Sequence, residues 1–335
     1  MEKNYGLNYI RGVGAILIML YHYTTRYFDS LYNMGAESSH VGVWWGCWAV
    51  SVFFILSGFL TVANVNDTLT PKKFAVKRVT RLYPSYWVAI ILTTIVTYAL
   101  NFPFKTDLVS TIFNFTMLQG FVGIPSVDGA YWTLRCELWF YVIITLTLFL
   151  KKRNYTILST IWLVLIILQD GLFAALGIDG ALDTIAKLIL LSDWASAFII
   201  GMSFCAIYKN KKDYLAYINL LLCFAIEYTQ RPLNRFIFTI FIAALIYILI
   251  VKRIKFKYDG ILNFFASISF PLYLVHQKIG YTIINKMEKI AGNGTPFGVV
   301  IAIVVSIALA YLIHKFVEIP ASKRLQTKLL KAKKD

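Results

Sequence analysis

Three side chains that can exchange protons stand inside apolar stretches of the sequence. His22 follows Arg11 by eleven residues in one stretch, Glu137 lies in a second and His276 in a third. Ionisable side chains are costly in a bilayer, and they usually face the interior of a helix bundle, where they pair or serve a site. A carboxylate and two imidazoles at one depth would form an acid–base cluster able to take a proton from a hydroxyl.

A second set of residues suits phosphate binding. Arg78 and Arg81 are three residues apart in the basic loop KKFAVKRVTRLYPSYW, so they would share one helix face just before Pro84. Each guanidinium presents a planar fork of donors and stays charged, which matches a phosphate or pyrophosphate. The alternative is that this loop only sets membrane topology. In VSVFFILSGFL, Ser57 and Gly58 would allow close approach of a ligand or of a neighbouring helix.

Transmembrane helices would have to position these residues. The chain has 335 residues, of which 59% are hydrophobic and 15% charged, and a soluble domain does not need so apolar a composition. Crossing the ~30 Å hydrocarbon core takes about 20 mostly apolar residues. The sequence therefore predicts an all-α fold, a polytopic membrane helix bundle of about ten transmembrane helices. The predicted spans are 7–27, 41–63, 85–101, 130–150, 155–173, 186–208, 214–228, 235–251, 261–284 and 297–316.

Lys and Arg alternate between the predicted loops. The loops on one side contain Lys72, Lys73, Lys77, Arg78 and Arg81; Lys151, Lys152 and Arg153; Lys209, Lys211 and Lys212; Lys252, Arg253, Lys255 and Lys257; and Lys323, Arg324, Lys328, Lys331, Lys333 and Lys334. The opposite loops contain Lys105, Arg231, Arg235, Lys286 and Lys289. The positive-inside rule therefore places both termini in the cytoplasm. The formal net charge of +16 then reflects topology, and we expect contact with the lipid bilayer but with no nucleic acid.

The order of the helices places the ionisable residues at two depths. At about 1.5 Å and 100° per residue, Arg11 and His22 lie ~16 Å apart along the first helix on nearly the same face. Arg11 would lie at the cytoplasmic end, whereas His22, Glu137 and His276 would lie ~7–12 Å from the outer ends of their helices. The alternatives are that each His bonds a neighbouring carbonyl and that Glu137 neutralises Arg135.

Outside the spans the chain offers little room for another site. We expect one membrane domain, residues 1–320, followed by a basic cytoplasmic tail, residues 321–335. The tail could contact anionic lipid, although a solvated end is the simpler interpretation. The four cysteines are scattered through the spans without CxxC spacing, so the sequence predicts neither a disulfide framework nor a metal site.

Several of these segments resemble signatures of acyltransferase family 3. Arg11, ten residues and His22 are similar to the arginine-ten-histidine signature of its first helix, and FFILSGF resembles its FFxLSGF segment. RVTRLYP, beginning at Arg78, is similar to RxxRLxP. WTLRCELWFY, which contains Glu137, resembles WSLxxExxFY, with Thr133 where Ser is common.

Two later segments extend the resemblance over nearly the whole chain. SFPLYLVH, which ends at His276, resembles the S-x-PLYLxH element of a late helix, and Glu318 begins a terminal ExP element. The resemblance implies a ten-helix O-acyltransferase of a bacterial inner (plasma) membrane. It implies cytoplasmic acyl-CoA, usually acetyl-CoA, as co-substrate, no metal, and a hydroxyl of a saccharide or glycolipid as acceptor on the outer side.

The resemblance also assigns roles to individual residues. His22 would take the proton of the acceptor hydroxyl, and Glu137 would fix the tautomer of His22 or stabilise its cation. His276 and Tyr273 would position the substrate or donate to the oxyanion. The residues expected at the donor site are Arg11, Ser57, Gly58, Arg78 and Arg81.

Two other functions fit the same composition. A proton-coupled transporter or exporter of a saccharide or lipid-linked precursor would also place ionisable residues within its helices. The arginine pair, which a proton relay does not require, and the lack of evident inverted halves favour the transferase. A non-catalytic membrane partner that keeps the scaffold is a third possibility. Dependence on acyl-CoA would separate these functions.

Overall fold

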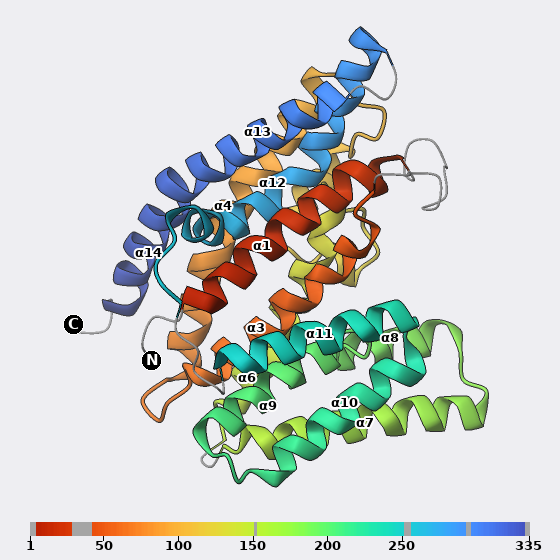
Figure 1. The fold of residues 1–335 in the computed structure, drawn as a ribbon, viewed down its shortest axis with the longest axis vertical. Helices are drawn as coiled ribbons and strands as arrows, with labels where there is room; N and C mark the ends of the chain where they lie inside the picture. The colour runs from red at the N-terminus through yellow and green to blue at the C-terminus, as the bar shows by residue number, and fades with distance from the viewer. Residues whose placement is uncertain (1–4, 29–41, 151–152, 251–255, 293–295, 332–335) are drawn as a thin grey trace. The chain divides into compact units, whose positions relative to one another are not determined.

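A computed structural model describes residues 5–28, 42–150, 153–250, 256–292 and 296–331. Within these ranges the regular secondary structure consists of helices, without a strand, which confirms the all-α fold class (Figure 1). Seven basic residues that the sequence assigns to loops or to the tail lie outside the described residues: Lys151, Lys152, Lys252, Arg253, Lys255, Lys333 and Lys334.

A helix overlaps each of the ten predicted ranges. These helices are α1 Tyr5–Tyr21, α3 Val50–Ala63, α4 Pro71–Ala99, α6 Trp132–Thr147, α7 Tyr155–Leu176, α9 Ala195–Lys209, α10 Tyr214–Gln230, α11 Leu233–Ile250, α12 Gly260–Ala291 and α13 Pro296–Ile313. Six segments of the described chain are both long and apolar enough to cross a bilayer: Trp44–Ala63, Pro71–Ala99, Tyr155–Leu176, Gly180–Lys209, Leu233–Ile250 and Pro296–Leu330. The protein is thus a polytopic helical membrane protein, while the count of ten spans and the cytoplasmic termini stay predictions.

The chain divides into two compact units, each built from separate segments. The first unit comprises Met1–Ile10, Trp48–Thr68 and Leu150–Tyr258, and the second comprises Arg11–Cys47, Leu69–Phe149 and Asp259–Asp335. Among the predicted site residues, Ser57 and Gly58 belong to the first unit. The second unit holds the others.

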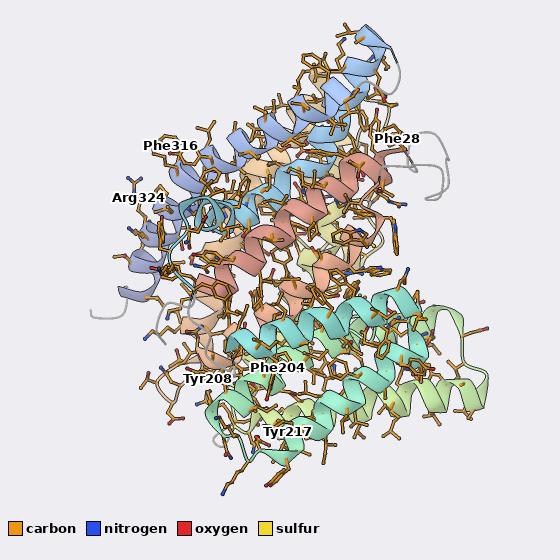
Figure 2. All side chains as sticks on the ribbon, in the orientation of Figure 1. Phe28, Phe204, Tyr208, Tyr217, Phe316 and Arg324 are labelled. Carbon is orange, nitrogen blue, oxygen red and sulfur yellow. The ribbon has the colours of Figure 1, made fainter. Side chains whose placement is uncertain are left out.

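Helix α9 forms the core of the first unit. Most of its side chains are buried, and it packs against α3, α7, α10 and α11. The rings of Phe204, on α9, and Tyr247 are tilted against one another with their centres 5.8 Å apart. Phe204 is labelled in Figure 2. A short helix, α8 Gly180–Leu190, precedes α9, and Leu191 between them adopts a left-handed backbone with φ 53°, which turns the chain sharply into α9.

In the second unit α12 is the central helix. It lies side by side with α13 and also packs against α4 (Figure 1). The connection between α4 and α6 forms a short helix, α5 Leu108–Asn114, and two single turns at Gln119–Phe121 and Gly129–Tyr131. The second of these turns, Gly129–Tyr131, packs against α12.

Helix α4 begins earlier than the sequence predicted. We expected a basic loop followed by a span from residue 85, but α4 starts at Pro71 and continues through Pro84. Thr70 caps it by accepting the Lys73 N–H at 3.2 Å, and a proline at the first helical position needs no hydrogen bond. The helix therefore starts earlier than the predicted span, because length and apolarity gave no weight to this cap, whereas the helix expected at the two arginines is confirmed. Arg78 and Arg81 lie on the helix itself.

The described part of the basic tail is also helical. Helix α14, Ile319–Lys331, packs against α4 within the second unit. Arg324 is drawn on this helix in Figure 2. Most of its side chains, including those of Leu325 and Leu329, are exposed, so the boundary at residue 320 and the solvated end stay predictions.

Candidate active site

The structure brings two of the three proton-exchanging residues into contact. Nε2 of His276 lies 2.9 Å from Nδ1 of His22, and the ring centres are 4.8 Å apart. His276 is only 1% exposed, whereas His22 is partly exposed. The two imidazoles come from α12 and from the end of α1, both in the second unit.

The surrounding carbonyl groups determine where the protons lie on this pair. Nδ1 of His276 is 2.9 Å from the Tyr273 carbonyl oxygen and 3.1 Å from that of Leu272. A carbonyl can only accept, so Nδ1 of His276 carries the proton and Nε2 carries a lone pair. Nδ1 of His22 must then be the donor, shared between His276 and the Ile18 carbonyl at 2.9 Å. This leaves Nε2 of His22 as an unprotonated base.

A change in helix geometry coincides with His22. Helix α1 ends at Tyr21, and His22–Arg26 form a π-helical turn. Such wider turns often occur at functional sites, since they rotate the following side chains relative to the helix before them. Thr24 donates to the Leu20 carbonyl oxygen at 2.7 Å within this turn. The turn also directs Tyr23 towards α12.

Tyr23 holds the backbone at His276. Its hydroxyl donates to the His276 carbonyl oxygen at 2.6 Å and lies 2.7 Å from the Ser306 hydroxyl on α13. Gly280 makes room for the ring, because a Cβ built at Gly280 would lie 2.2 Å from it. Glycine is therefore required at this close approach.

Asp128 and Tyr131 support the same part of α12, and the sequence gave no indication of this role. Asp128 is buried and accepts the backbone N–H of Lys278 at 2.7 Å and that of Ala130 at 2.8 Å. Tyr131 donates to the Leu274 carbonyl oxygen at 3.2 Å. These side chains hold backbone groups on both sides of the His276 position. Asp128 lies in the connection before α6, where burial raises the pKa of its carboxyl to about 6.

Tyr273 is engaged in the same support. Its hydroxyl donates to the Ala130 carbonyl oxygen at 2.8 Å and lies 2.8 Å from the Thr133 hydroxyl. The residue that replaces the usual serine of the family segment, Thr133, thus contacts Tyr273 directly. Because the Tyr273 proton is used by a backbone carbonyl, this geometry favours positioning over donation to an oxyanion.

Glu137 lies among the arginines and their aromatic partners. The Tyr141 hydroxyl donates to its carboxylate. The Arg78 guanidinium carbon lies 4.6 Å from the Tyr141 ring centre and 4.9 Å from that of Phe74. Nδ1 of His22 contacts His276 and the Ile18 carbonyl, not Glu137, because depth in the membrane does not determine which helices are neighbours.

Arg11 and Arg81 interact with one another within the second unit. Arg11 interacts electrostatically with Arg81 and with Glu318, and its Nε is buried without a hydrogen-bond partner. Arg81 is exposed on α4. A buried guanidinium nitrogen without a partner, close to a second cation, fits an anionic ligand that supplies the missing acceptor.

Ser57 and Gly58 lie on α3 in the first unit. A Cβ at Gly58 would lie 2.1 Å from the Phe198 carbonyl oxygen of α9. Gly201 of α9 is equally close to the Ile55 carbonyl oxygen, at 1.9 Å. The structure therefore gives Gly58 the helix-packing role that the sequence left open beside ligand approach. In the described part of the chain, no group of three or more His, Cys, Asp or Glu residues could hold a metal ion.

Comparisons with known proteins bear on this geometry. A family profile for an acyltransferase domain, that of acyltransferase family 3, matches residues 4–315. The chain is 23% identical to ORF330 of Acidianus two-tailed virus, whose name assigns it provisionally to the acetyltransferases, over 82% of this chain and 84% of that protein. It is 29% identical to exopolysaccharide production protein ExoZ of Rhizobium meliloti (strain 1021), over 47% of this chain and 49% of ExoZ.

A shorter match involves a third relative. Nodulation protein 10 of Rhizobium leguminosarum bv. viciae is 29% identical over 31% of this chain and 34% of its own length. The matches to ExoZ and to the nodulation protein thus span less than half of each relative. No solved structure matches the chain significantly. Because the family profile covers most of the sequence, the chain belongs to acyltransferase family 3 and carries that family's acyltransferase domain within a multi-pass helical membrane protein.

Proposed function

We propose that this protein is an integral membrane O-acyltransferase that moves an acetyl group from cytoplasmic acetyl-CoA to a hydroxyl of a cell-surface or lipid-linked saccharide. The observation that carries the proposal is the His22–His276 pair, which leaves Nε2 of His22 as a base. Family membership supports acyl transfer. The name of ExoZ, which refers to exopolysaccharide production, supports a saccharide acceptor. The apolar helices and the family support a membrane location, which we propose is the bacterial plasma membrane.

The reaction balances as a direct transfer. Nε2 of His22 takes the proton of the acceptor hydroxyl while the hydroxyl oxygen forms a bond to the thioester carbonyl carbon. The resulting imidazolium keeps its Nδ1–H bonds to Ile18 and His276. When the C–S bond breaks, the imidazolium returns the proton to the leaving thiolate. The products are a saccharide ester and free CoA.

In this proposal His276 and Tyr273 position His22 and do not contact the reacting atoms. The Nδ1–H of His276 and the hydroxyl of Tyr273 both donate to backbone carbonyls. They therefore hold the base in place instead of contacting the developing oxyanion. This is the arrangement in which a second residue selects the tautomer of a catalytic histidine.

In this proposal the arginines bind the acyl donor. Arg11, Arg78 and Arg81 would hold the phosphates of CoA. The stacking of Arg78 on Tyr141, together with the buried Nε of Arg11, supports this assignment. Glu137 would orient Tyr141 through their hydrogen bond and so place Arg78. Ser57 and Gly58 remain proposed donor contacts only through the family resemblance, because Gly58 packs against α9.

Dependence on acyl-CoA tests the function against its alternative, saccharide export. Inverted membrane vesicles containing the protein would be supplied with acetyl-labelled acetyl-CoA and with the host's lipid-linked and polymeric glycans. We expect label to appear as an alkali-labile ester on glycan, and to be absent with Arg11→Ala at matched expression. Saccharide movement that continues without any acyl-CoA, with no ester formed, would establish the exporter instead.

A further inference from the structure

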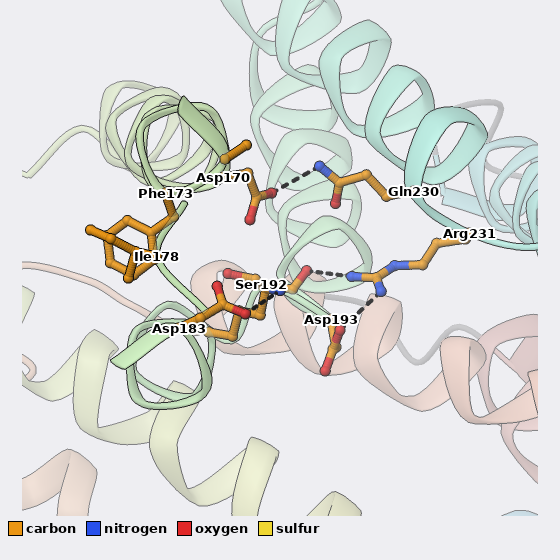
Figure 3. A pocket seen from close by; sticks show the side chains of 10 residues that line it. Asp170, Phe173, Ile178, Asp183, Ser192, Asp193, Gln230 and Arg231 are labelled. Atoms are coloured by element: carbon orange, nitrogen blue, oxygen red, sulfur yellow. Dashed lines mark hydrogen bonds and ion pairs between the residues drawn. The ribbon is translucent and has the colours of Figure 1, made fainter. Parts of the chain in front are cut away.

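The first unit contains a pocket that the transfer chemistry does not use. Its volume is about 410 Å³, within the range of roughly 300–1,000 Å³ that is typical of small-ligand sites. The end of α7, helix α8, the link just before α9 and the turn between α10 and α11 line it (Figure 3). The side chains that characterise it are Asp170, Phe173, Asp183, Lys187, Asp193 and Arg231.

The charged groups in this pocket are matched to one another. Lys187 pairs with Asp183 at 2.6 Å, and Arg231 pairs with Asp193 at 2.9 Å. Carboxylates outnumber cations by one, since Asp170 accepts its hydrogen bond from the neutral amide of Gln230 at 2.9 Å (Figure 3). The excess negative charge would therefore repel a phosphate, whereas it would not repel a neutral ligand.

Neutral hydroxyl groups fit this lining. A hydroxyl both donates and accepts, so it can give its hydrogen to a carboxylate oxygen while it receives one from a guanidinium or ammonium group. Three carboxylates and two cations line the pocket, which therefore offers hydroxyl groups both acceptors and donors. Phe173 and Ile178 line the pocket beside them and provide an apolar wall for C–H groups.

A buried network holds the pocket in place. Arg235 pairs with Glu227 at 3.1 Å, and their side chains are only 7% and 1% exposed. Arg235 also donates to the Asp193 carbonyl oxygen at 2.7 Å, and its guanidinium lies 4.0 Å from the Trp194 ring centre. Buried ion pairs contribute little net stability, so their use behind a pocket points to the fixing of its geometry.

The direction in which the pocket opens follows from the first unit alone. The pocket includes residues just before the start of α9 and at the end of α10. The basic residues Lys209, Lys211 and Lys212 lie at the opposite ends of these two helices. Because basic loops mark the cytoplasmic side, the pocket faces away from the cytoplasm, where a cell-surface saccharide is found.

We infer that this pocket binds a neutral sugar unit of the acceptor saccharide, an inference that rests on the proposed acyl transfer for its biological meaning. The pocket is large enough for a monosaccharide or a small disaccharide. The charged side chains bind the hydroxyl groups of the sugar, and Phe173 packs against its C–H groups. Acidic sugars and phosphorylated headgroups would be disfavoured by the additional carboxylate of Asp170.

Equilibrium binding tests the inference without acyl donor. The full chain would be placed in nanodiscs free of sugar detergents and titrated calorimetrically with maltose, cellobiose, lactose and N,N′-diacetylchitobiose, and separately with glycerol 3-phosphate and phosphoethanolamine. We expect at least one disaccharide to bind with a Kd of about 1 mM or lower, equivalent to roughly 4 kcal/mol. Neither phosphate compound should compete with it.

Three variants locate the binding. Ala174→Trp fills the pocket without removing a polar group, and Asp170→Ala removes an acceptor; each should weaken disaccharide binding by about tenfold or more. Asp179→Ala removes an exposed carboxylate between α7 and α8 that does not line the pocket, and should leave binding unchanged. Ala174→Trp remains informative if Asp170→Ala fails to fold.

Three results would overturn the inference. They are no binding of any disaccharide up to about 50 mM, binding unaffected by Ala174→Trp, and phosphate-compound binding with the same dependence on the variants. The last result would assign the pocket to lipid headgroups. This binding test does not depend on catalysis. If the protein binds a disaccharide but transfers no acetyl group, the proposed function is refuted and the binding inference stands.

Discussion

At the scale of single residues, the His22–His276 hydrogen bond predicts that His276 positions His22 and does more than occupy the space beside it. His276→Ala removes one of the two acceptors of Nδ1–H of His22 and leaves only the Ile18 carbonyl, so the tautomer and orientation of the ring are held less firmly. We expect kcat to fall by at least about tenfold, but by no more than the ~10²–10⁴-fold that a general base contributes. KM for acetyl-CoA should stay unchanged. His276→Gln, whose amide oxygen can accept the same hydrogen, should recover part of the loss. Equal rates for the Ala and Gln variants would contradict this role.

Arg78 supports a second prediction at this scale. Its guanidinium stacks on Tyr141, and a lysine keeps the charge but not the planar stacking. A cation–π contact of about 0.5–2 kcal/mol converts to a roughly 2–30-fold higher KM for acetyl-CoA in Arg78→Lys, with little change in kcat. Lys73→Ala, an exposed cation in the first turn of the same helix, is the control. A similar rise in KM for both variants would mean that general charge, not stacking, binds the donor.

At the scale of helices, the contact between α12 and the π-helical turn depends on Gly280. A methyl group there would lie 2.2 Å from the Tyr23 ring, which holds the His276 carbonyl. We expect Gly280→Ala to destabilise the protein by about 1–3 kcal/mol and to lower transfer activity. Gly171→Ala in α7 has open space around it and should stabilise by up to ~1 kcal/mol. Thermal unfolding in detergent measures both variants, and a neutral Gly280→Ala would refute the close packing.

Asp128 links the loop before α6 to α12 through a pH-dependent group. Burial raises the pKa of Asp128 from 3.8 to about 6, so the folded state binds this proton more tightly than the unfolded state. The stability that it contributes is complete below pH 3.8 and is lost as the pH rises through about 6. The wild-type melting temperature should therefore fall relative to that of Asp128→Asn between about pH 4 and 7. A constant difference across this range would contradict the burial of the carboxyl.

At the scale of the whole molecule, the alternation of basic segments predicts which loops face the cytoplasm. Lys211→Cys, in the basic loop after α9, should react with an impermeant thiol reagent only in inverted vesicles. Asp179→Cys, between α7 and α8, should react only in intact cells. Cys136, Cys205 and Cys223 are buried and Cys47 is partly exposed, so labelling of the wild type gives the background to subtract. Reaction of both variants from one side would refute the predicted orientation of the first unit.

Across the whole molecule, the helices were predictable from the sequence, whereas the contacts between them were predictable only in part. Run length located helices in all ten ranges, since crossing a bilayer demands apolar residues in succession. Depth along the helices placed His22 and His276 at one level, and the structure pairs them. Glu137 shared that depth but joins Tyr141, because helix neighbours depend on tertiary packing. Asp128 was missed because it lies outside the apolar stretches and bonds a backbone group that no pattern identifies.

The central claim is that Nε2 of His22 is the base for acetyl transfer. The most direct measurement is the initial rate of labelled acetyl transfer from acetyl-CoA into glycan, comparing wild type with His22→Gln at matched expression and thermal stability. We predict that His22→Gln lowers the rate by about 10²–10⁴-fold while KM for acetyl-CoA stays within about twofold. A His22→Gln protein that transfers acetyl at the wild-type rate would contradict the account.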